Sequence, residues 1–273
     1  MTVVGRVTAV WWPPQGALAV ALADAADREP PFPGIPPGPA LPVRIFIAPT
    51  RALYDSLTRG RLPSWSEGAA FPGLSSVVLW ATGSPADIEN TLRHELAHVA
   101  LRRRVQHSLP LWFEEGYASV AAGEWNRTQV FQLDWHLLGG AALDLDSVDA
   151  SLRGGAGEAA GAYALATTAV LLLERWGGRD GLRPLLDTLA RAPTFDAALR
   201  ATDHVTLDRF EELWAQDVRH RYGWLAAFGA AALFWGVTGS LLAVLLWRRR
   251  KRDAPRRAAL DEGWDIPPDA PTA

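Results

Sequence analysis

The segment WLAAFGAAALFWGVTGSLLAVLLW, residues 224–247, contains no charged side chain and strongly restricts how this chain can fold. A helix of this length spans about 36 Å at about 1.5 Å per residue, which exceeds the ~30 Å hydrocarbon core of a bilayer. Trp224 and Trp247 stand at its two ends, where interfacial aromatic residues are common. A buried core helix of this length normally includes polar positions. We therefore predict one membrane-spanning helix over 222–248, followed by a basic and then disordered tail over 249–273.

The charges that flank this segment differ on its two sides. Seven Lys or Arg residues lie within ten positions after it, beginning with RRRKR at 248–252, whereas two arginines stand just before it. Such a bias predicts a single-pass protein of the cell membrane, with a cytoplasmic C-terminal tail and an extracytoplasmic domain before the span. Residues 1–30 contain no recognisable signal peptide, because Pro13 and Pro14 interrupt the apolar run. Either a leader precedes Met1, or the protein is tail-anchored with its domain in the cytoplasm.

Residues 1–221 have the pattern of one α+β domain. Three β-branched, apolar stretches are typical of strands: 3–12, 42–49 and 74–82. The second half contains apolar helical segments instead, including 110–123 and 161–178, and each of these stops at glycine. Strands that precede helices predict a mixed N-terminal sheet and a helical C-terminal half.

Composition excludes several kinds of site. The chain has no cysteine, which excludes disulfides, zinc–thiolate sites and cysteine nucleophiles. Its net charge of −3 gives no electrostatic case for nucleic-acid binding. The G-x-S-x-G, G-x-G-x-x-G and P-loop motifs are absent. A zinc site in this chain must therefore use His, Asp and Glu side chains.

The sequence HELAH at 94–98 has the H-E-x-x-H pattern, on a predicted helix that begins near Pro85. Residues i and i+4 share one helix face, so His94 and His98 can bind one metal ion. Glu95 points about 100° away around the axis and can reach a water on that ion. Zinc lowers the pKa of such a water to about 7, and a carboxylate beside it can take the proton. The pattern constrains only three positions, so two surface histidines remain the alternative.

A second motif, LWFEEGYAS at 111–119, includes two adjacent carboxylates in an apolar helix. H-E-x-x-H followed by W-x-x-E-G-x-A resembles the gluzincin metallopeptidases, and especially the peptidase MA-like group, over roughly 75–215. The resemblance implies that Glu115, with sixteen residues between it and His98, is the third ligand of a Zn²⁺ ion. It also implies a zincin-like (thermolysin-like) catalytic domain over 1–221.

The resemblance suggests further roles around the metal. A tyrosine or histidine from a later helix would stabilise the oxyanion, and Tyr163 is preferred to Tyr117 and His136 because it follows a glycine-rich loop within AYALA. A core tyrosine with a satisfied hydroxyl is the alternative for Tyr163. Ligand histidines are normally oriented by nearby carboxylates, for which three aspartates are available: Asp134, Asp144 and Asp146.

The resemblance also bears on the substrate. In related proteases, the edge strand that precedes the metal helix pairs with an extended substrate, and here this would be 74–82.

The neighbour of the third ligand, Glu114, would face solvent or pair with an arginine of 102–104. The G-x-M-E-N signature of the aminopeptidases is absent, so an endopeptidase is expected rather than an exopeptidase.

Two hypotheses follow. In the first, the protein is a membrane-anchored zinc metallopeptidase that hydrolyses peptides or unfolded proteins near the membrane. His94, His98 and Glu115 bind Zn²⁺, Glu95 is the general base and Tyr163 stabilises the oxyanion. In the second, it is a catalytically inactive, membrane-tethered module of the same fold that binds peptides or a partner. The sequence leaves the cleavage preference and the oligomeric state open.

Overall fold

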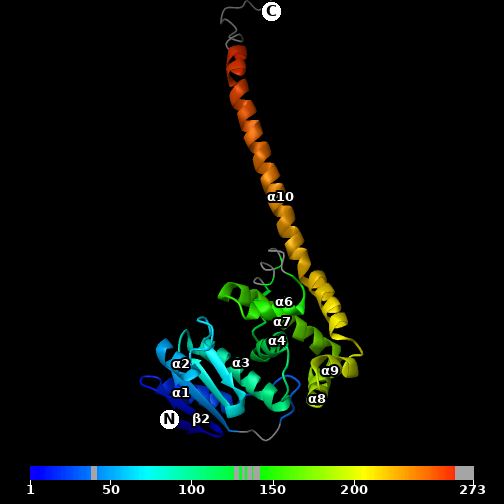
Figure 1. Ribbon diagram of the computed structural model, residues 1–273. Helices are drawn as coiled ribbons and strands as arrows, with labels where there is room; N and C mark the ends of the chain where they lie inside the picture. The colour runs from blue at the N-terminus through cyan, green and yellow to red at the C-terminus, as the bar shows by residue number, and fades with distance from the viewer. Residues whose placement is uncertain (38–41, 126–128, 131–132, 134–136, 138–141, 262–273) are drawn as a thin grey trace, which may run out of the picture. The chain divides into compact units, whose positions relative to one another are not determined.

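In the computed structural model (Figure 1), the chain divides into two compact units, Met1–Gly223 and Trp224–Ala273. Side chains are not described for 223–233 and 256–261. The residues that the structure describes are 1–37, 42–125, 129–130, 133, 137 and 142–261.

A five-stranded sheet forms the N-terminal part of the first unit, with strand order β1-β2-β3-β5-β4. The strands β2, β3 and β5 run parallel to one another, whereas β1 and β4 pair antiparallel with β2 and β5. The strands are Thr2–Val4 (β1), Val7–Trp11 (β2), Val43–Ala48 (β3), Gly68–Phe71 (β4) and Ser76–Trp80 (β5). A mixed sheet followed by helices confirms the predicted α+β class.

The expectation that 74–82 forms the sheet edge is wrong. β5 pairs with β3 on one side and with β4 on the other, so both of its backbone edges are occupied. On this side of the sheet the edge strand is β4, whose sequence Gly-Ala-Ala-Phe lacks the β-branched residues that mark strands, and β1 forms the other edge. β4 is defined by its ladder with β5 and not by its own propensity, and the sequence pattern therefore missed it.

The two faces of the sheet are covered by different helices. Side chains alternate along a strand, so Ile45 and Ile47 point to one face and Ala48 points to the other. Helices α1 (Gly16–Asp27) and α3 (Pro85–Arg104) pack on the first face. Helix α2 (Arg51–Thr58) packs on the second face through the fully buried Tyr54.

Helix α3 begins where the sequence predicts. The Ser84 hydroxyl accepts a hydrogen bond from the backbone N–H of Asp87, and the Asp87 carboxylate accepts one from the backbone N–H of Ser84. This capping box, with Pro85 at the first turn, sets the register of the helix. The H-E-x-x-H residues consequently lie in the middle of α3, away from both helix ends.

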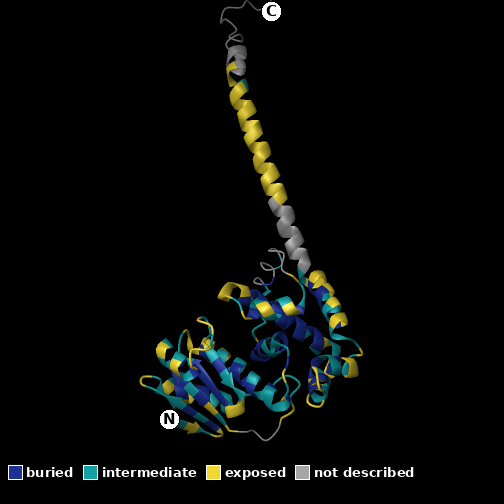
Figure 2. Ribbon diagram, viewed as in Figure 1, coloured by how far each residue is buried: buried dark blue, intermediate teal, exposed yellow. Residues whose placement is uncertain are grey.

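The C-terminal half of the first unit is helical and surrounds α7. Its described helices are α4 (Leu111–Ala122), α6 (Leu145–Leu152), α7 (Ala156–Trp176), α8 (Arg183–Leu189), α9 (Phe195–Thr202) and the first part of α10 (Leu207–Asp261), with a short 3₁₀ turn at Gly178–Asp180. A further 3₁₀ turn, Pro72–Leu74, joins β4 to β5 in the sheet. Trp112 of α4 stacks on Phe210 of α10, with ring centroids 5.7 Å apart. The Trp214 indole donates a hydrogen bond to the Thr168 hydroxyl of α7. The central helices of this part, α4 and α7, consist mostly of buried residues (Figure 2).

Within the described residues, only α7 meets the length and hydropathy expected of a membrane span. Two thirds of its apolar stretch (67 %) is buried within the fold, as in the core helix of a soluble domain. The predicted span over 222–248 lies within α10, and the side chains of 223–233 are not among those described. The described apolar side chains of 234–247, by contrast, are exposed (Figure 2).

A close approach between α4 and α7 makes Gly116 a sensitive position. A methyl group there would overlap the carbonyl oxygen of Ala166 and the Val170 side chain. We expect Gly116→Ala to destabilise the first unit by about 1–3 kcal/mol, measured by thermal or denaturant unfolding of the full-length chain. Gly157→Ala is the matched control, because a methyl group at that exposed position of α7 meets nothing within 4 Å. Equal stability losses in the two variants would contradict this packing.

Candidate metal centre

Three potential metal ligands converge between α3 and α4. The Nε2 atoms of His94 and His98 lie 3.2 Å apart, and both histidines belong to α3. The Glu115 Oε2 atom of α4 lies 3.5 Å from His94 Nε2 and 3.6 Å from His98 Nε2. The structure therefore brings together the three residues that the sequence motifs indicate.

The packing of α4 explains how Glu115 reaches the histidines. A short connection over 105–110 follows α3, so that α4 packs along the same helix. Gly116 lies against the backbone of Ala166 in α7, and the residue before it is directed toward α3. The absence of a side chain at Gly116 thus lets one helix contact both neighbours at the level of the site.

The arrangement fits a small divalent ion. Atoms that bind one tetrahedral ion at about 2.0–2.1 Å lie about 3.3 Å from one another. The observed separations, 3.2, 3.5 and 3.6 Å, are close to this value. Two imidazole nitrogens and one carboxylate oxygen also leave a coordination position for a reactant.

The orientation of His94 is set by a residue that the sequence analysis missed. Its Nδ1 atom lies 3.1 Å from Oε1 of Glu124, so an Nδ1–H donor directs Nε2 toward the other ligands. Glu124 directly follows Gly123, which ends α4 with a left-handed φ of 71°. In the sequence, Glu124 could have been identified only as an acidic residue that directly follows the glycine at the end of the second motif helix.

The aspartates considered for this orienting role do not provide it in the described part of the chain. Asp144 caps α6 by accepting a hydrogen bond from the backbone N–H of Ser147, at 2.7 Å. Asp146 lies in the first turn of α6. Asp134 lies outside the described residues.

Glu95 is buried beside the ligands and only 9 % exposed. The backbone of Gly68, at the start of β4, packs against its carboxylate so closely that any side chain there would collide with it. Burial raises the pKa of Glu95, the charges of Glu115 and Glu124 add to this effect, and the two histidines oppose it. A carboxylate with a raised pKa is suited to accepting a proton near neutral pH.

The charged state of the ligands follows from their mutual contacts. Burial opposes protonation of His94, but hydrogen bonds with Glu115 and Glu124 outweigh it and raise its pKa well above the usual value. Glu115 likewise raises the pKa of His98 against burial. Burial alone would raise the pKa of Glu115, yet the histidines hold it far below its usual range. Because a metal ligand must be neutral imidazole, metal binding has to release protons from this centre.

Tyr163 of α7 lies beside the centre. Its ring centroid is 6.3 Å from that of His94 and 6.2 Å from that of Trp65. Burial raises its pKa, as do the negative charge of Glu115 and a hydrogen bond with it, so the phenol stays neutral and can donate a hydrogen bond. Tyr117 is instead fully buried in the core and donates to the carbonyl oxygen of Pro33 at 2.8 Å. His136 lies outside the described residues.

A cavity of about 600 Å³ opens over the ligands and Glu95. Its walls include Ala69–Phe71 of the edge strand, Arg61–Pro63, Trp65, Ser66, Leu152 and Tyr163. Glu114 also lines this cavity, and its Oε1 atom lies 2.5 Å from an Arg102 nitrogen. Of the two alternatives for Glu114, the structure thus supports pairing with an arginine.

Comparison with known proteins agrees with this geometry. A family model described as the peptidase MA superfamily matches residues 37–220. The match includes both motif helices, the edge strand and α7. No curated protein matches the chain.

Removal of the Glu124 charge should weaken metal binding without removing a ligand. We expect Glu124→Gln to lower metal affinity about 10- to 100-fold, because the His94 ring loses its charged partner. Competition with a chromophoric chelator measures this affinity on the metal-free protein. Glu67→Gln is the matched control, since exposed Glu67 lines the same opening as Glu124. If both variants bind metal as the wild type does, Glu124 has no orienting role.

Proposed function

The chain belongs to the peptidase MA superfamily, and from this premise we propose that it is a membrane-anchored zinc metallopeptidase that cleaves peptide bonds within peptides or proteins. The observation that carries this proposal is the convergence of His94, His98 and Glu115 beside a buried carboxylate, in a cleft with an open strand edge. The absence of the aminopeptidase signature favours an endopeptidase.

Zinc is the metal that this donor set favours. Zinc accepts imidazole nitrogen and carboxylate oxygen, and catalytic zinc sites commonly use two histidines and one glutamate with one open position. His94, His98 and Glu115 would hold the ion. When bound, zinc supplies Lewis acidity and lowers the pKa of a coordinated water to near 7.

The protein's own groups would then move the proton and stabilise charge. Glu95 accepts a proton from the attacking water and returns it to the leaving amine, a role that its raised pKa supports. Tyr163 donates a hydrogen bond to the oxygen on which negative charge develops. Glu124 keeps the His94 ring in one orientation through the reaction.

The edge strand β4 offers a binding mode for the substrate backbone. One side of β4 is paired with β5, and Ala69, Ala70 and Phe71 line the cleft. An extended peptide can add to such an edge through main-chain hydrogen bonds, which favours unfolded segments over compact domains. Binding of this kind recognises the main chain of the substrate more than its side chains.

Membrane attachment is supported by the C-terminal unit. Apolar side chains of α10 from Phe234 to Trp247 are exposed, a state that water disfavours and lipid accepts. The Lys251 ammonium lies 5.2 Å from the centre of the Trp247 ring, at the start of the basic flank. We assign residues 1–221 to the catalytic domain, 222–248 to the span and 249–273 to a cytoplasmic tail, with the catalytic domain outside the cytoplasm.

Glu95→Gln should abolish peptide hydrolysis while zinc stays bound. The amide cannot accept the proton, so turnover should fall by at least about 100-fold, measured on a peptide library alongside the zinc content. Glu89→Gln, an exposed position on the same helix, should retain full activity. Normal turnover by Glu95→Gln would remove Glu95 from the mechanism. Stoichiometric zinc without cleavage by the wild type would favour a binding module instead.

The orientation can be tested at the C-terminus of the full-length chain. Fluorescent-protein and alkaline-phosphatase fusions report cytoplasmic and extracytoplasmic locations respectively. We expect fluorescence and no phosphatase activity, because the basic residues after Trp247 oppose export. Phosphatase activity at the tail would reverse the orientation. Release of the chain from membranes by high salt or alkaline carbonate would contradict the span itself.

A further inference from the structure

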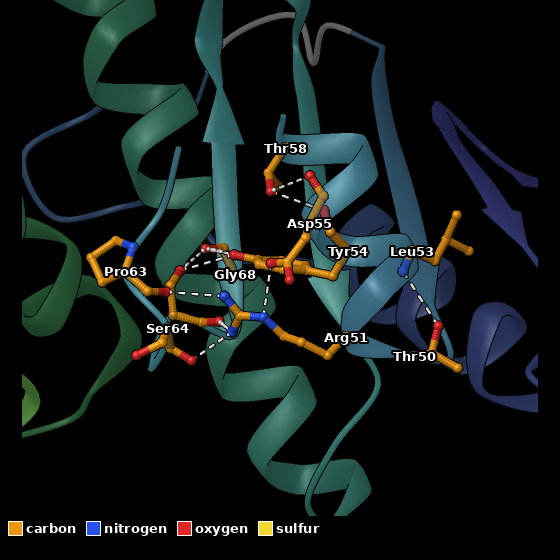
Figure 3. A network of polar contacts seen from close by, with 10 residues as sticks. Thr50, Arg51, Leu53, Tyr54, Asp55, Thr58, Pro63, Ser64 and Gly68 are labelled. Atoms are coloured by element: carbon orange, nitrogen blue, oxygen red, sulfur yellow. Dashed lines mark hydrogen bonds and ion pairs between the residues drawn. The ribbon is translucent and has the colours of Figure 1, made fainter. Parts of the chain in front are cut away.

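Arg51, the first residue of α2, lies in a network of polar contacts (Figure 3) with a loop that includes cleft-lining residues. Its Nη1 atom donates to the carbonyl oxygens of Ser64 and Ser66, at 2.7 and 2.9 Å. Its Nη2 atom donates to the carbonyl oxygen of Pro63 at 3.1 Å. One side chain therefore binds three backbone carbonyls of a single loop.

The Arg51 guanidinium is itself held in place. Its Nε atom donates to the Asp55 carboxylate at 2.8 Å. It also lies over the rings of Tyr54 and Trp80, 5.1 and 5.5 Å from their centres. A planar guanidinium can lie over two aromatic rings and donate hydrogen bonds to four acceptors at the same time. The compact ammonium group of a lysine cannot do both.

Tyr54 extends the same network to the edge strand. Its hydroxyl donates to the carbonyl oxygen of Gly68 at 2.6 Å and lies 2.9 Å from the Ser66 hydroxyl. Gly68 begins β4 and packs against the Glu95 carboxylate. The segment from Pro63 to Gly68 is thus tied to α2 at both of its ends.

This segment contacts the candidate centre through Trp65. The Trp65 ring lies edge-on to the Tyr163 ring, with centroids 6.2 Å apart, and both residues line the cavity over the ligands. Tyr163 in turn lies beside His94. The loop that Arg51 binds and the candidate centre therefore meet at the contact between Trp65 and Tyr163.

We propose that Arg51 is a positioning residue for the peptidase reaction, which fixes Pro63–Gly68 and so holds Trp65 against Tyr163. This inference rests on the proposed function. A partly exposed pair with Asp55 across one helical turn would by itself contribute little. The three contacts with carbonyl oxygens differ from this ion pair, because they join α2 to a loop that lies 12 to 15 residues further along the chain.

The test compares Arg51→Lys with Arg200→Lys in the full-length chain. Arg200 makes the same kind of Nε contact, with Asp196 at 2.7 Å, but it lies on α9 and lines no part of the cleft. We expect Arg51→Lys to lower kcat about 10- to 100-fold with KM changed less than about threefold and zinc content unchanged. Arg200→Lys should match the wild type in all three quantities.

Hydrogen exchange provides a readout that needs no activity. Amides of 62–70 should exchange faster in Arg51→Lys, whereas amides in the middle of α3 should not. Unchanged exchange in 62–70 would overturn the anchoring. Faster exchange with wild-type kcat, or a loss that lies wholly in KM, would overturn the positioning role. Absence of cleavage by the wild type would instead reject the proposed function.

A second variant separates positioning from general destabilisation. Trp65→Ala leaves the backbone carbonyls that Arg51 binds and removes the contact with Tyr163. It should lower kcat as Arg51→Lys does, and the double variant should lose little more than either single variant, because both act through one contact. Fully multiplicative losses would show that Arg51 does not act through Trp65. If Arg51→Lys does not fold, normal kcat in Trp65→Ala alone would overturn the proposal.

Discussion

The close approach of two imidazoles and a carboxylate between α3 and α4 is the contact around which the rest of the site is arranged. Buried ionisable groups destabilise a fold unless they are paired. Here Glu115 is paired with His94 and His98, which offsets its burial and shifts the pKa values of all three. The same pairing forms a ligand set with donor separations suited to one ion. Stability of the metal-free fold and capacity for metal thus have one physical origin.

The sheet and the loop before its edge strand also contact the residues of this centre. Helix α3 packs on the sheet through its apolar face. This packing sets where His94 and His98 lie relative to the strands. The edge strand approaches Glu95 at a glycine, where no side chain separates backbone from carboxylate. Arg51 and Tyr54 then hold the loop before that strand. The cleft is therefore built by contacts between segments that are far apart in sequence.

Two apolar helices of similar composition have different surroundings. α7 is rich in alanine and leucine and is buried against α4 and α6. The described apolar side chains of α10 from 234 to 247 are exposed. Hydropathy alone does not separate a core helix from a membrane span, because both avoid water. The basic flank after Trp247 and the exposure of these side chains are the observations on which the proposed membrane span rests.

The sequence by itself determined the features that depend on local spacing. Helical periodicity places His94 and His98 on one face, and the cap at Ser84 defines where their helix begins. The order of the segments, with strands in the first half and helices in the second, was sufficient for the α+β class. Tertiary structure alone decided that Glu124 orients His94 and that β4 forms the sheet edge. These two features depend on how α4 ends against α3 and on pairing between strands, and neither contact leaves a periodic pattern in the sequence.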